Sequence, residues 1–340
     1  MTGSPQRPVD LRQFKSALIV KPSSLGDIVH TLPALRLIRQ AHPHLRLRWI
    51  ANREWTPLLD GSPYLDEVIP FDRRAFRGIT GAAKWLAWAA RWNRTPRETP
   101  EIVLDFQGLL RSGLISYTRG SNQILGLSDA REGAASFYDQ TIAVDPKAHA
   151  VDRYLEMVRA LGIPFSTEDI QFGLPAGTLP AGFEKTASYV LVHPYSRGEG
   201  KALPPESLQT LCDCLTGTRI LIVGVSKNPI ALNGGHITDL TNQTQIPELI
   251  GLMRNARACV SVDSGPMHMA AAVNPRTLGI HTWSDPRQVG PYPSTATVWK
   301  AGRICHRTDL AEAECLSSQQ VTPPDARRLA DFILGTLLAS

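Results

Sequence analysis

Long apolar runs and cysteine are both scarce in this chain of 340 residues. No apolar run approaches the ~20 residues that a membrane-spanning helix needs, so we expect no such helix. Residues 1–8 are polar and lack the apolar core of a signal peptide, and we expect a loose tail there. The five cysteines are odd in number and scattered. This pattern is typical of a protein in a reducing compartment and not of a disulfide framework.

Signatures of a metal centre and of nucleic-acid binding are missing as well. Cys305, His306 and Cys315 are residue types that bind zinc, but no fourth ligand has a suitable spacing, so we expect no metal site. The net charge of +5 favours an anionic partner. The chain has no helix-turn-helix, zinc-finger or aromatic RNA-binding motif, and we therefore expect no nucleic-acid partner.

What is present is the composition of a globular protein, with 43% hydrophobic and 20% charged residues. Strand-like apolar runs alternate with helical stretches in two series, separated by the Pro- and Gly-rich segment 174–182. This alternation predicts an α/β fold in which helices cover both faces of parallel sheets. We expect two domains, 1–175 and 176–340, that face a central cleft.

The two series contain elements of similar length. In the first series the expected strands are Ala17–Val20, Leu45–Ala51, Leu65–Phe71 and Glu101–Phe106, and the expected helices are Ile28–Ala41, Gly78–Trp92, Gly108–Thr118 and His149–Leu161. In the second series the expected strands are Tyr189–His193, Arg219–Gly224, Ala258–Val262, Arg276–His281 and Thr297–Lys300, and the expected helices are Pro205–Leu215, Ile246–Ala256, Met269–Val273 and Pro324–Leu338. The last helix is also a candidate for packing back on the first domain.

The central motif is the glycine-centred turn 262–268, which joins an apolar strand to a helix of small residues. A helix N-terminus leaves backbone N–H groups free, and the positive end of its dipole favours an anion. Gly265 lets the backbone approach a ligand, Pro266 fits the first helical position, and Ser264 can cap the helix or donate to a phosphate oxygen. The turn therefore predicts a nucleotide-diphosphate site; the alternative is an ordinary strand-to-helix turn with a serine cap.

A similar loop, Lys21–Asp27, follows the first strand and precedes a helix. It places the carboxylate of Asp27 beside the flexible Gly26 at the start of that helix. Asp27 is either an acidic N-cap or a catalytic base presented at the carboxyl end of a parallel strand. Both glycine turns are expected to face the cleft.

The stretch 73–97 is basic and contains no acidic residue. Its basic residues are Arg73, Arg74, Arg77, Lys84, Arg91, Arg94 and Arg97. Trp85, Trp88 and Trp92 recur at helical spacing within it. One interpretation is a tryptophan-packed core face with a solvated basic face. The other is a surface for an anionic amphiphile or for lipid headgroups, where Trp and Arg side chains are favourable.

Taken together, these motifs resemble the bacterial lipopolysaccharide heptosyltransferases, which form glycosyltransferase family 9. The resemblance extends from about Ser16 to Tyr292. The segments that carry it, in order, are 21–27, 32–35, 105–112, 135–138, 262–271 and 290–292.

The resemblance implies a GT-B fold of two Rossmann-like domains and an inverting transfer that needs no metal or cofactor. It implies that Asp27 is the catalytic base, although a helix cap remains the alternative. The implied donor-binding residues are Ser196, Lys201, Asp263, Ser264, Gly265, Pro266 and His268, and the implied acceptor-binding residues are Ser24, Gly26, Gln107 and Arg111. For Lys201 a solvated loop lysine, and for Arg111 a plain surface residue, are the alternatives.

By this resemblance we expect heptose transfer from ADP-heptose to the 3-deoxy-octulosonic acid (Kdo) of a lipid A–Kdo acceptor. We expect a cytoplasmic protein attached peripherally to the inner membrane. The chain departs from the family at Leu203, where a Trp is common, at 225–229, where an acid is common, and at 279–286, where a Phe-Gly pair is common. These departures leave open that the donor is a nucleotide sugar other than ADP-heptose. A non-catalytic nucleotide-sugar-binding protein and a nucleotide-sugar epimerase also stay open as functions of such a chain.

Overall fold

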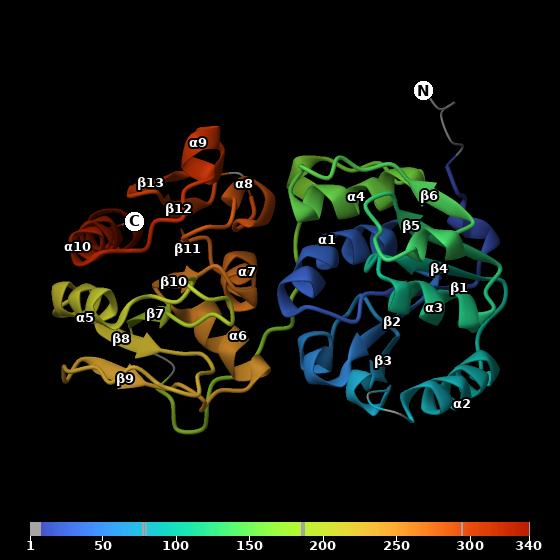
Figure 1. The fold of residues 1–340 in the computed structure, drawn as a ribbon, viewed down its shortest axis with the longest axis horizontal. Helices are drawn as coiled ribbons and strands as arrows, with labels where there is room; N and C mark the ends of the chain where they lie inside the picture. The colour runs from blue at the N-terminus through green and yellow to red at the C-terminus, as the bar shows by residue number, and fades with distance from the viewer. Residues whose placement is uncertain (1–7, 77, 79, 185–187, 294, 340) are drawn as a thin grey trace. The chain divides into compact units, whose positions relative to one another are not determined.

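Figure 1 shows the computed structural model of the chain, which describes residues 8–76, 78, 80–184, 188–293 and 295–339. The expected tail at 1–7 and Arg77 of the basic stretch lie outside these described residues. The chain divides into two compact units, Met1–Leu174 and Pro175–Ser340. Within the described ranges, no helix is both long enough and apolar enough to cross a membrane.

The first unit is built on a six-stranded parallel sheet with the strand order β3-β2-β1-β4-β5-β6. Its strands are β1 (Ser16–Val20), β2 (Arg46–Asn52), β3 (Glu67–Phe71), β4 (Glu101–Asp105), β5 (Gln123–Leu127) and β6 (Gln140–Ile142). Its α-helices are α1 (Leu25–Ala41), α2 (Gly81–Arg94), α3 (Leu110–Arg119) and α4 (Ala150–Ala160), and its short 3-10 helices are η1 (Leu11–Gln13), η2 (Arg53–Leu58), η3 (Arg73–Phe76), η4 (Ala134–Phe137) and η5 (Thr167–Asp169).

The central strands β1 and β4 are buried along their whole length, because the sheet is covered on both faces. Val20, the last residue of β1, pairs with Ile50 of β2 and with Asp105 of β4. The carboxyl ends of these three strands therefore lie side by side, and the loops that follow them meet at one edge of the sheet.

The second unit is built on a seven-stranded sheet with the order β13-β12-β11-β10-β7-β8-β9, in which β13 is antiparallel to β12. Its strands are β7 (Tyr189–His193), β8 (Arg219–Ile222), β9 (Ile237–Asp239), β10 (Ala258–Val262), β11 (Thr277–His281), β12 (Thr297–Lys300) and β13 (Arg303–His306). Its helices are α5 (Pro205–Cys214), α6 (Ile246–Asn255), α7 (Gly265–Val273), α8 (Pro286–Val289), η6 (Arg307–Asp309), α9 (Glu312–Cys315), α10 (Pro323–Phe332) and the π-helical η7 (Ile333–Leu337).

The final helix completes the core of the second unit. α10 packs against α5, and Leu329 and Ile333 are fully buried with Val260 of the central strand β10. Packing of this helix on the first domain stays a prediction.

The sequence pattern identifies most of these elements but does not predict β5, β6, β9 or β13. β6 and β9 have three residues each, too few to show an alternating pattern. β5 contains Gly126, which is depleted in strands. This glycine is required by packing, since a Cβ there would lie 2.1 Å from Cε2 of Tyr138.

A buried charge network lies at the amino end of the first sheet. Glu101 is fully buried and forms ion pairs with Arg48 and Arg119, the latter through an Nε–Oε1 contact of 2.7 Å. The Arg119 guanidinium also lies over the ring of Trp92, 4.5 Å from its centroid. Burial lowers the pKa of Arg48 and of Arg119 to about 10, so both remain cationic at neutral pH.

We expect Glu101→Gln to reduce the free energy of unfolding by about 3–5 kcal/mol, because it leaves two buried guanidinium groups without their carboxylate. Urea unfolding of the full chain measures this. The control is Glu98→Gln, whose half-exposed side chain pairs with Arg46 and should change stability by about 0.5 kcal/mol or less. Equal small effects of the two substitutions would contradict the assignment.

Candidate active site

The loop after β1 places Asp27 at the start of α1. Ser24 is the N-cap residue, and its backbone N–H and its hydroxyl both donate to Asp27 Oδ2, at 2.9 and 2.7 Å. Asp27 is therefore the third helical residue of a capping box and not the N-cap residue itself, so the expected acidic N-cap is replaced by a serine N-cap with Asp27 as its partner. This capping box also fixes the Asp27 carboxylate at the carboxyl end of a central strand, with Gly26 buried beside it in the first turn of the helix.

The loop after β4 is shaped by its own carboxylate, Asp105, and is joined to the Asp27 loop by Gln107. Buried Asp105 accepts hydrogen bonds from the backbone N–H groups of Gln107 and Gly108, at 2.8 and 3.2 Å, and from the hydroxyl of Tyr138 at 2.9 Å. The side-chain oxygen of Gln107 in turn accepts a 3.1 Å bond from the backbone N–H of Ser23. Gln107 therefore joins the two loops, which places it next to Ser24 and Asp27.

A buried lysine lies beneath these loops. The Lys21 ammonium donates to the carbonyl of Phe106 at 2.8 Å and to the hydroxyl of Tyr154 at 2.7 Å. Burial acts to lower the pKa of Lys21, but the neighbouring Tyr154 and the carboxylate of Asp27 outweigh it and raise this pKa above its usual value. The lysine thus carries a positive charge near Asp27 and ties the end of β1 to the end of β4.

The sequence interpretation assigned no role to Lys21 or Tyr138. A lysine that directly follows a fully apolar strand is a usable signal, since such a position is buried when the strand is central. Arg111, by contrast, is exposed in the first turn of α3. Its part in acceptor binding stays a prediction.

In the second unit, α7 begins directly after the central strand β10. Ser264 is the N-cap residue, Gly265 is the first helical residue and Pro266 is the second, one position later than expected. The Ser264 side chain makes no capping bond. Its hydroxyl donates instead to the carbonyl of Val262 at 3.0 Å and lies 3.3 Å from Nδ1 of His193. Of the two roles left open for this side chain, capping is therefore not the one it has here, and the backbone N–H groups of the first turn are not covered by it.

The Asp263 carboxylate binds the one lysine that the resemblance places at the donor. Lys201 Nζ lies 2.5 Å from Asp263 Oδ2 and 4.2 Å from the centroid of the Trp283 ring. Burial acts to raise the pKa of Asp263, but His281 and Lys201 nearby hold this pKa below its usual value. Asp263 is therefore ionised, and Lys201 is a paired, largely buried lysine and not a solvated one.

Two further contacts fix the loop that carries Lys201. The Ser196 hydroxyl donates to the backbone carbonyl of Asp263 at 3.2 Å, and the Trp283 indole N–H donates to the carbonyl of Glu199 at 3.1 Å. The structure thus brings Ser196, Lys201, Asp263 and Ser264 together at the carboxyl ends of the adjacent strands β7 and β10. His268 lies buried one helical turn further along α7.

Two histidines that the sequence interpretation did not identify line the same strand ends. His193 ends β7 and His281 ends β11, and both side chains are almost fully buried. His281 Nδ1 lies 3.0 Å from the Ser284 hydroxyl. Burial lowers the pKa of each histidine to about 4, so both are neutral at physiological pH. A histidine as the last residue of an apolar strand is the signal that could have found them.

The basic stretch of the first unit is in part structural. Trp92 is buried and its indole N–H donates to the carbonyl of Ile115 at 3.1 Å. Trp85 and Trp88 pack on one another and on the ring of Phe76. The tryptophan-packed face is thus the correct description of these rings. The Arg97 guanidinium also has a structural role, since it donates to main-chain carbonyls of α3 and its C-cap.

The fold and these two clusters define the class of protein. Each unit is an α/β sheet of Rossmann type that presents its polar loops at strand carboxyl ends, as ligand-binding sheets of this kind do. Two such units in one chain form the GT-B architecture of glycosyltransferases. No group of three or more His, Cys, Asp or Glu side chains within the described residues is arranged to hold a metal ion.

Comparison with known proteins identifies the family. A family model described as glycosyltransferase family 9 (heptosyltransferase) matches residues 91–317. The chain therefore belongs to this family and is a glycosyltransferase, which confirms the resemblance seen in the sequence.

Several relatives and structural neighbours are heptosyltransferases. Lipopolysaccharide heptosyltransferase 1 of Pseudomonas aeruginosa is 29% identical over 287 residues, which cover 81% of each chain. Lipopolysaccharide heptosyltransferase 1 of Escherichia coli K12 is 26% identical over 316 residues, 88% of this chain and 99% of that protein. The structure of E. coli heptosyltransferase WaaC with ADP has a TM-score of 0.74 at 24% identity and covers 94% of this chain and 99% of its own. The predicted GT-B fold is confirmed.

We expect the two neutral histidines to make the protein sensitive to acid. The unfolded chain binds protons at an ordinary histidine pKa of 6.5, whereas His193 and His281 bind them only near pH 4. The free energy of unfolding should therefore fall between about pH 6.5 and 4, by about 3 kcal/mol for each histidine. Urea unfolding across this range measures the slope. His281→Gln should reduce it and His44→Gln, at an exposed position, should not; a slope unaffected by His281→Gln would refute the assignment.

We expect Lys201→Met to weaken binding of a nucleoside diphosphate by about tenfold or more, because a charged hydrogen-bond donor beside the N-terminus of α7 is lost. Isothermal titration calorimetry measures the affinity. Lys147→Met removes an exposed lysine of the first unit and is the matched control. Equal affinities of the two variants would show that Lys201 does not contact the nucleotide.

Proposed function

We propose that this protein transfers an L-glycero-D-manno-heptose residue from ADP to the Kdo of the lipopolysaccharide inner core. The observation that carries the proposal is the paired Lys201 at the N-terminus of α7, where Asp263 and Ser196 hold it in place. An ammonium beside uncapped helix N–H groups is suited to a diphosphate. The names of the relatives support the sugar, as does the structure of E. coli WaaC with ADP-2-deoxy-2-fluoro heptose, which has a TM-score of 0.73 to this chain.

In the proposed reaction a hydroxyl of the acceptor attacks the anomeric carbon of the heptose. The bond from this carbon to the diphosphate oxygen breaks, and ADP leaves with the electron pair. Asp27 takes the proton of the attacking hydroxyl. A single displacement of this kind inverts the anomeric configuration.

The leaving diphosphate gains negative charge as the bond breaks, and this charge has to be stabilised. Lys201 keeps N–H donors for a phosphate oxygen while it is bound to Asp263, because an ammonium has three. The first-turn N–H groups of α7 add the positive end of the helix dipole. On this basis we propose that transfer does not require a metal ion.

The capping box and the catalytic role of Asp27 are compatible. The two bonds from Ser24 orient the carboxylate at a fixed position in the loop, and preorganised groups of this kind make effective catalysts. Lys21 below it places a positive charge near this carboxylate. The acceptor is a lipid, and we therefore propose that the protein works in the cytoplasm, attached peripherally to the inner membrane.

The departure from the family at 279–286, which contains Trp283, bears on the donor sugar. It favours an alternative function, an envelope glycosyltransferase that uses another nucleotide sugar. Leu203, where the family commonly has a tryptophan, is buried in the core of the second unit. Trp283, in contrast, is 50% exposed and lies directly beside Lys201. Lys201 lies over one face of this ring, and the exposed part of the side chain is open to a donor.

We expect Asp27→Asn to reduce the rate of heptose transfer about 10²–10⁴-fold, because the base is lost, while ADP binding is unchanged. Release of ADP from ADP-heptose in the presence of Kdo-bearing lipid A measures the rate. Asparagine retains a side-chain oxygen that can accept the capping bonds, so folding should be preserved.

The matched control is Asp169→Asn. Asp169 forms the same kind of capping box with Ser166, whose backbone N–H and hydroxyl both donate to Asp169 Oδ2 at 2.8 Å. It lies far along the chain from the loop that carries Asp27. Wild-type transfer by Asp27→Asn, or an equal loss in both variants, would exclude Asp27 as the base.

A further inference from the structure

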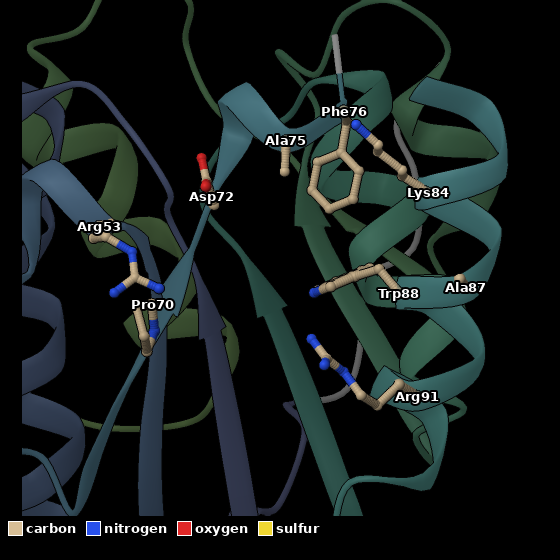
Figure 2. Close-up of a pocket in the computed structure, with 9 residues that line it drawn as sticks. All are labelled: Arg53, Pro70, Asp72, Ala75, Phe76, Lys84, Ala87, Trp88 and Arg91. Atoms are coloured by element: carbon tan, nitrogen blue, oxygen red, sulfur yellow. The ribbon is translucent and has the colours of Figure 1, made fainter. Parts of the chain in front are cut away.

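The first unit contains a cavity of about 530 Å³ between the β3–η3 segment and helix α2, shown in Figure 2. A volume of this size is typical of sites that bind small molecules. The residues that line it are Arg53, Pro70, Asp72, Ala75, Phe76, Lys84, Ala87, Trp88 and Arg91. None of them is among the donor-binding residues, which belong to the second unit.

The cavity is positively charged. Its lining contains three cations, Arg53, Lys84 and Arg91, and one carboxylate, Asp72. Within the described part of the chain, no ion pair is found for the side chains of the three cations. Figure 2 shows Arg91 reaching from α2 toward the strand that carries Pro70, with Arg53 on the opposite side. With three cations against one carboxylate, the lining has an excess of positive charge, which favours an anionic ligand.

The helix supplies its lining residues from one face. Lys84, Ala87, Trp88 and Arg91 are spaced as positions i, i+3, i+4 and i+7, which share one side of an α-helix. The two cations on α2 therefore lie on either side of the Trp88 ring along this face.

An aromatic wall accompanies the charges. Phe76 and Trp88 are in edge-to-face contact with ring centroids 5.9 Å apart, and Trp88 stacks on buried Trp92 at 5.4 Å. These contacts hold the Trp88 ring in place, while the small side chains of Ala75 and Ala87 leave room beside it. A rigid aromatic surface next to these cations is suited to a ligand that has a phosphate group on a sugar or apolar body.

The cavity lies at the same edge of the sheet as the loop that carries Asp27. Arg53 directly follows the end of β2, and Asp72 directly follows the end of β3. Both strands are parallel to β1, whose carboxyl end leads to Asp27. The cavity therefore opens at the same edge of the sheet as the Asp27 loop.

We propose that this cavity binds a phosphate monoester, with the phosphate between Arg53 and Arg91 and the attached body against Trp88 and Phe76. The phosphate belongs either to a soluble sugar phosphate or to the headgroup of a membrane lipid. Binding here does not require the transfer reaction, so it can be measured without a donor.

The first test is calorimetry of the full chain with glucose 1-phosphate, with glucose as the uncharged comparison. The probe for the second source is vesicles of phosphatidylcholine with and without phosphatidic acid, followed by sedimentation. The double variant Arg53→Gln/Arg91→Gln removes two exposed cations that face each other across the cavity. Its control is Arg94→Gln, which removes an exposed cation of the same helix outside the lining.

We expect the double variant to lose about tenfold or more in affinity for one of the phosphate probes, while Arg94→Gln retains wild-type affinity. Loss toward glucose 1-phosphate would identify a soluble ligand, and loss toward phosphatidic acid vesicles alone would identify a lipid headgroup. An equal response of the two variants to both probes, or binding of glucose as tight as that of its phosphate, would overturn the proposal. ADP affinity should be unchanged in the double variant, which separates this result from failure of the donor site.

Discussion

The ion pair between Lys201 and Asp263 is the interaction on which the donor side of the protein depends. It joins the loops that follow two adjacent strands, β7 and β10, at the point where α7 begins. Removing two charges from water is costly, and a partly buried pair of this kind is weak evidence for stability. The ion pair matters instead for function, because it fixes the Lys201 ammonium beside the N-terminus of α7. This ammonium lies over one face of the Trp283 ring, and the neutral His193 and His281 nearby add no competing positive charge.

The acceptor side is organised around a carboxylate in the same manner. Asp105 shapes its own loop and is held by Tyr138, whose ring can approach because β5 has a glycine at position 126. Gln107 connects this loop to the Asp27 loop, because its side-chain oxygen accepts a hydrogen bond from the backbone N–H of Ser23. Three of the sequence segments that carry the family resemblance in the first unit, 21–27, 105–112 and 135–138, are therefore joined by hydrogen bonds.

Much of this architecture could be predicted from the sequence. The strand-to-helix order at 258–273 is as predicted, because buried strands and small-residue helices have clear patterns, although the helix begins at Gly265 and Pro266 is its second residue. Short strands such as β6 and β9 could not be predicted, since their pairing depends on neighbours distant in the chain. The hydroxyl of Ser264 bonds to its own strand end and faces His193, an outcome decided by tertiary packing. The same holds for Arg97, whose carbonyl partners lie on another helix.

The most direct test of the account is the nucleotide selectivity of the purified protein, measured by calorimetry with ADP, UDP and GDP in the presence of a chelator. Heptose transfer from ADP by a metal-independent site predicts clear preference for ADP under these conditions. Preference for UDP or GDP would contradict the proposed donor while the family assignment stands. Binding of none of the three would contradict the assignment of Lys201 and the N-terminus of α7 as the diphosphate site.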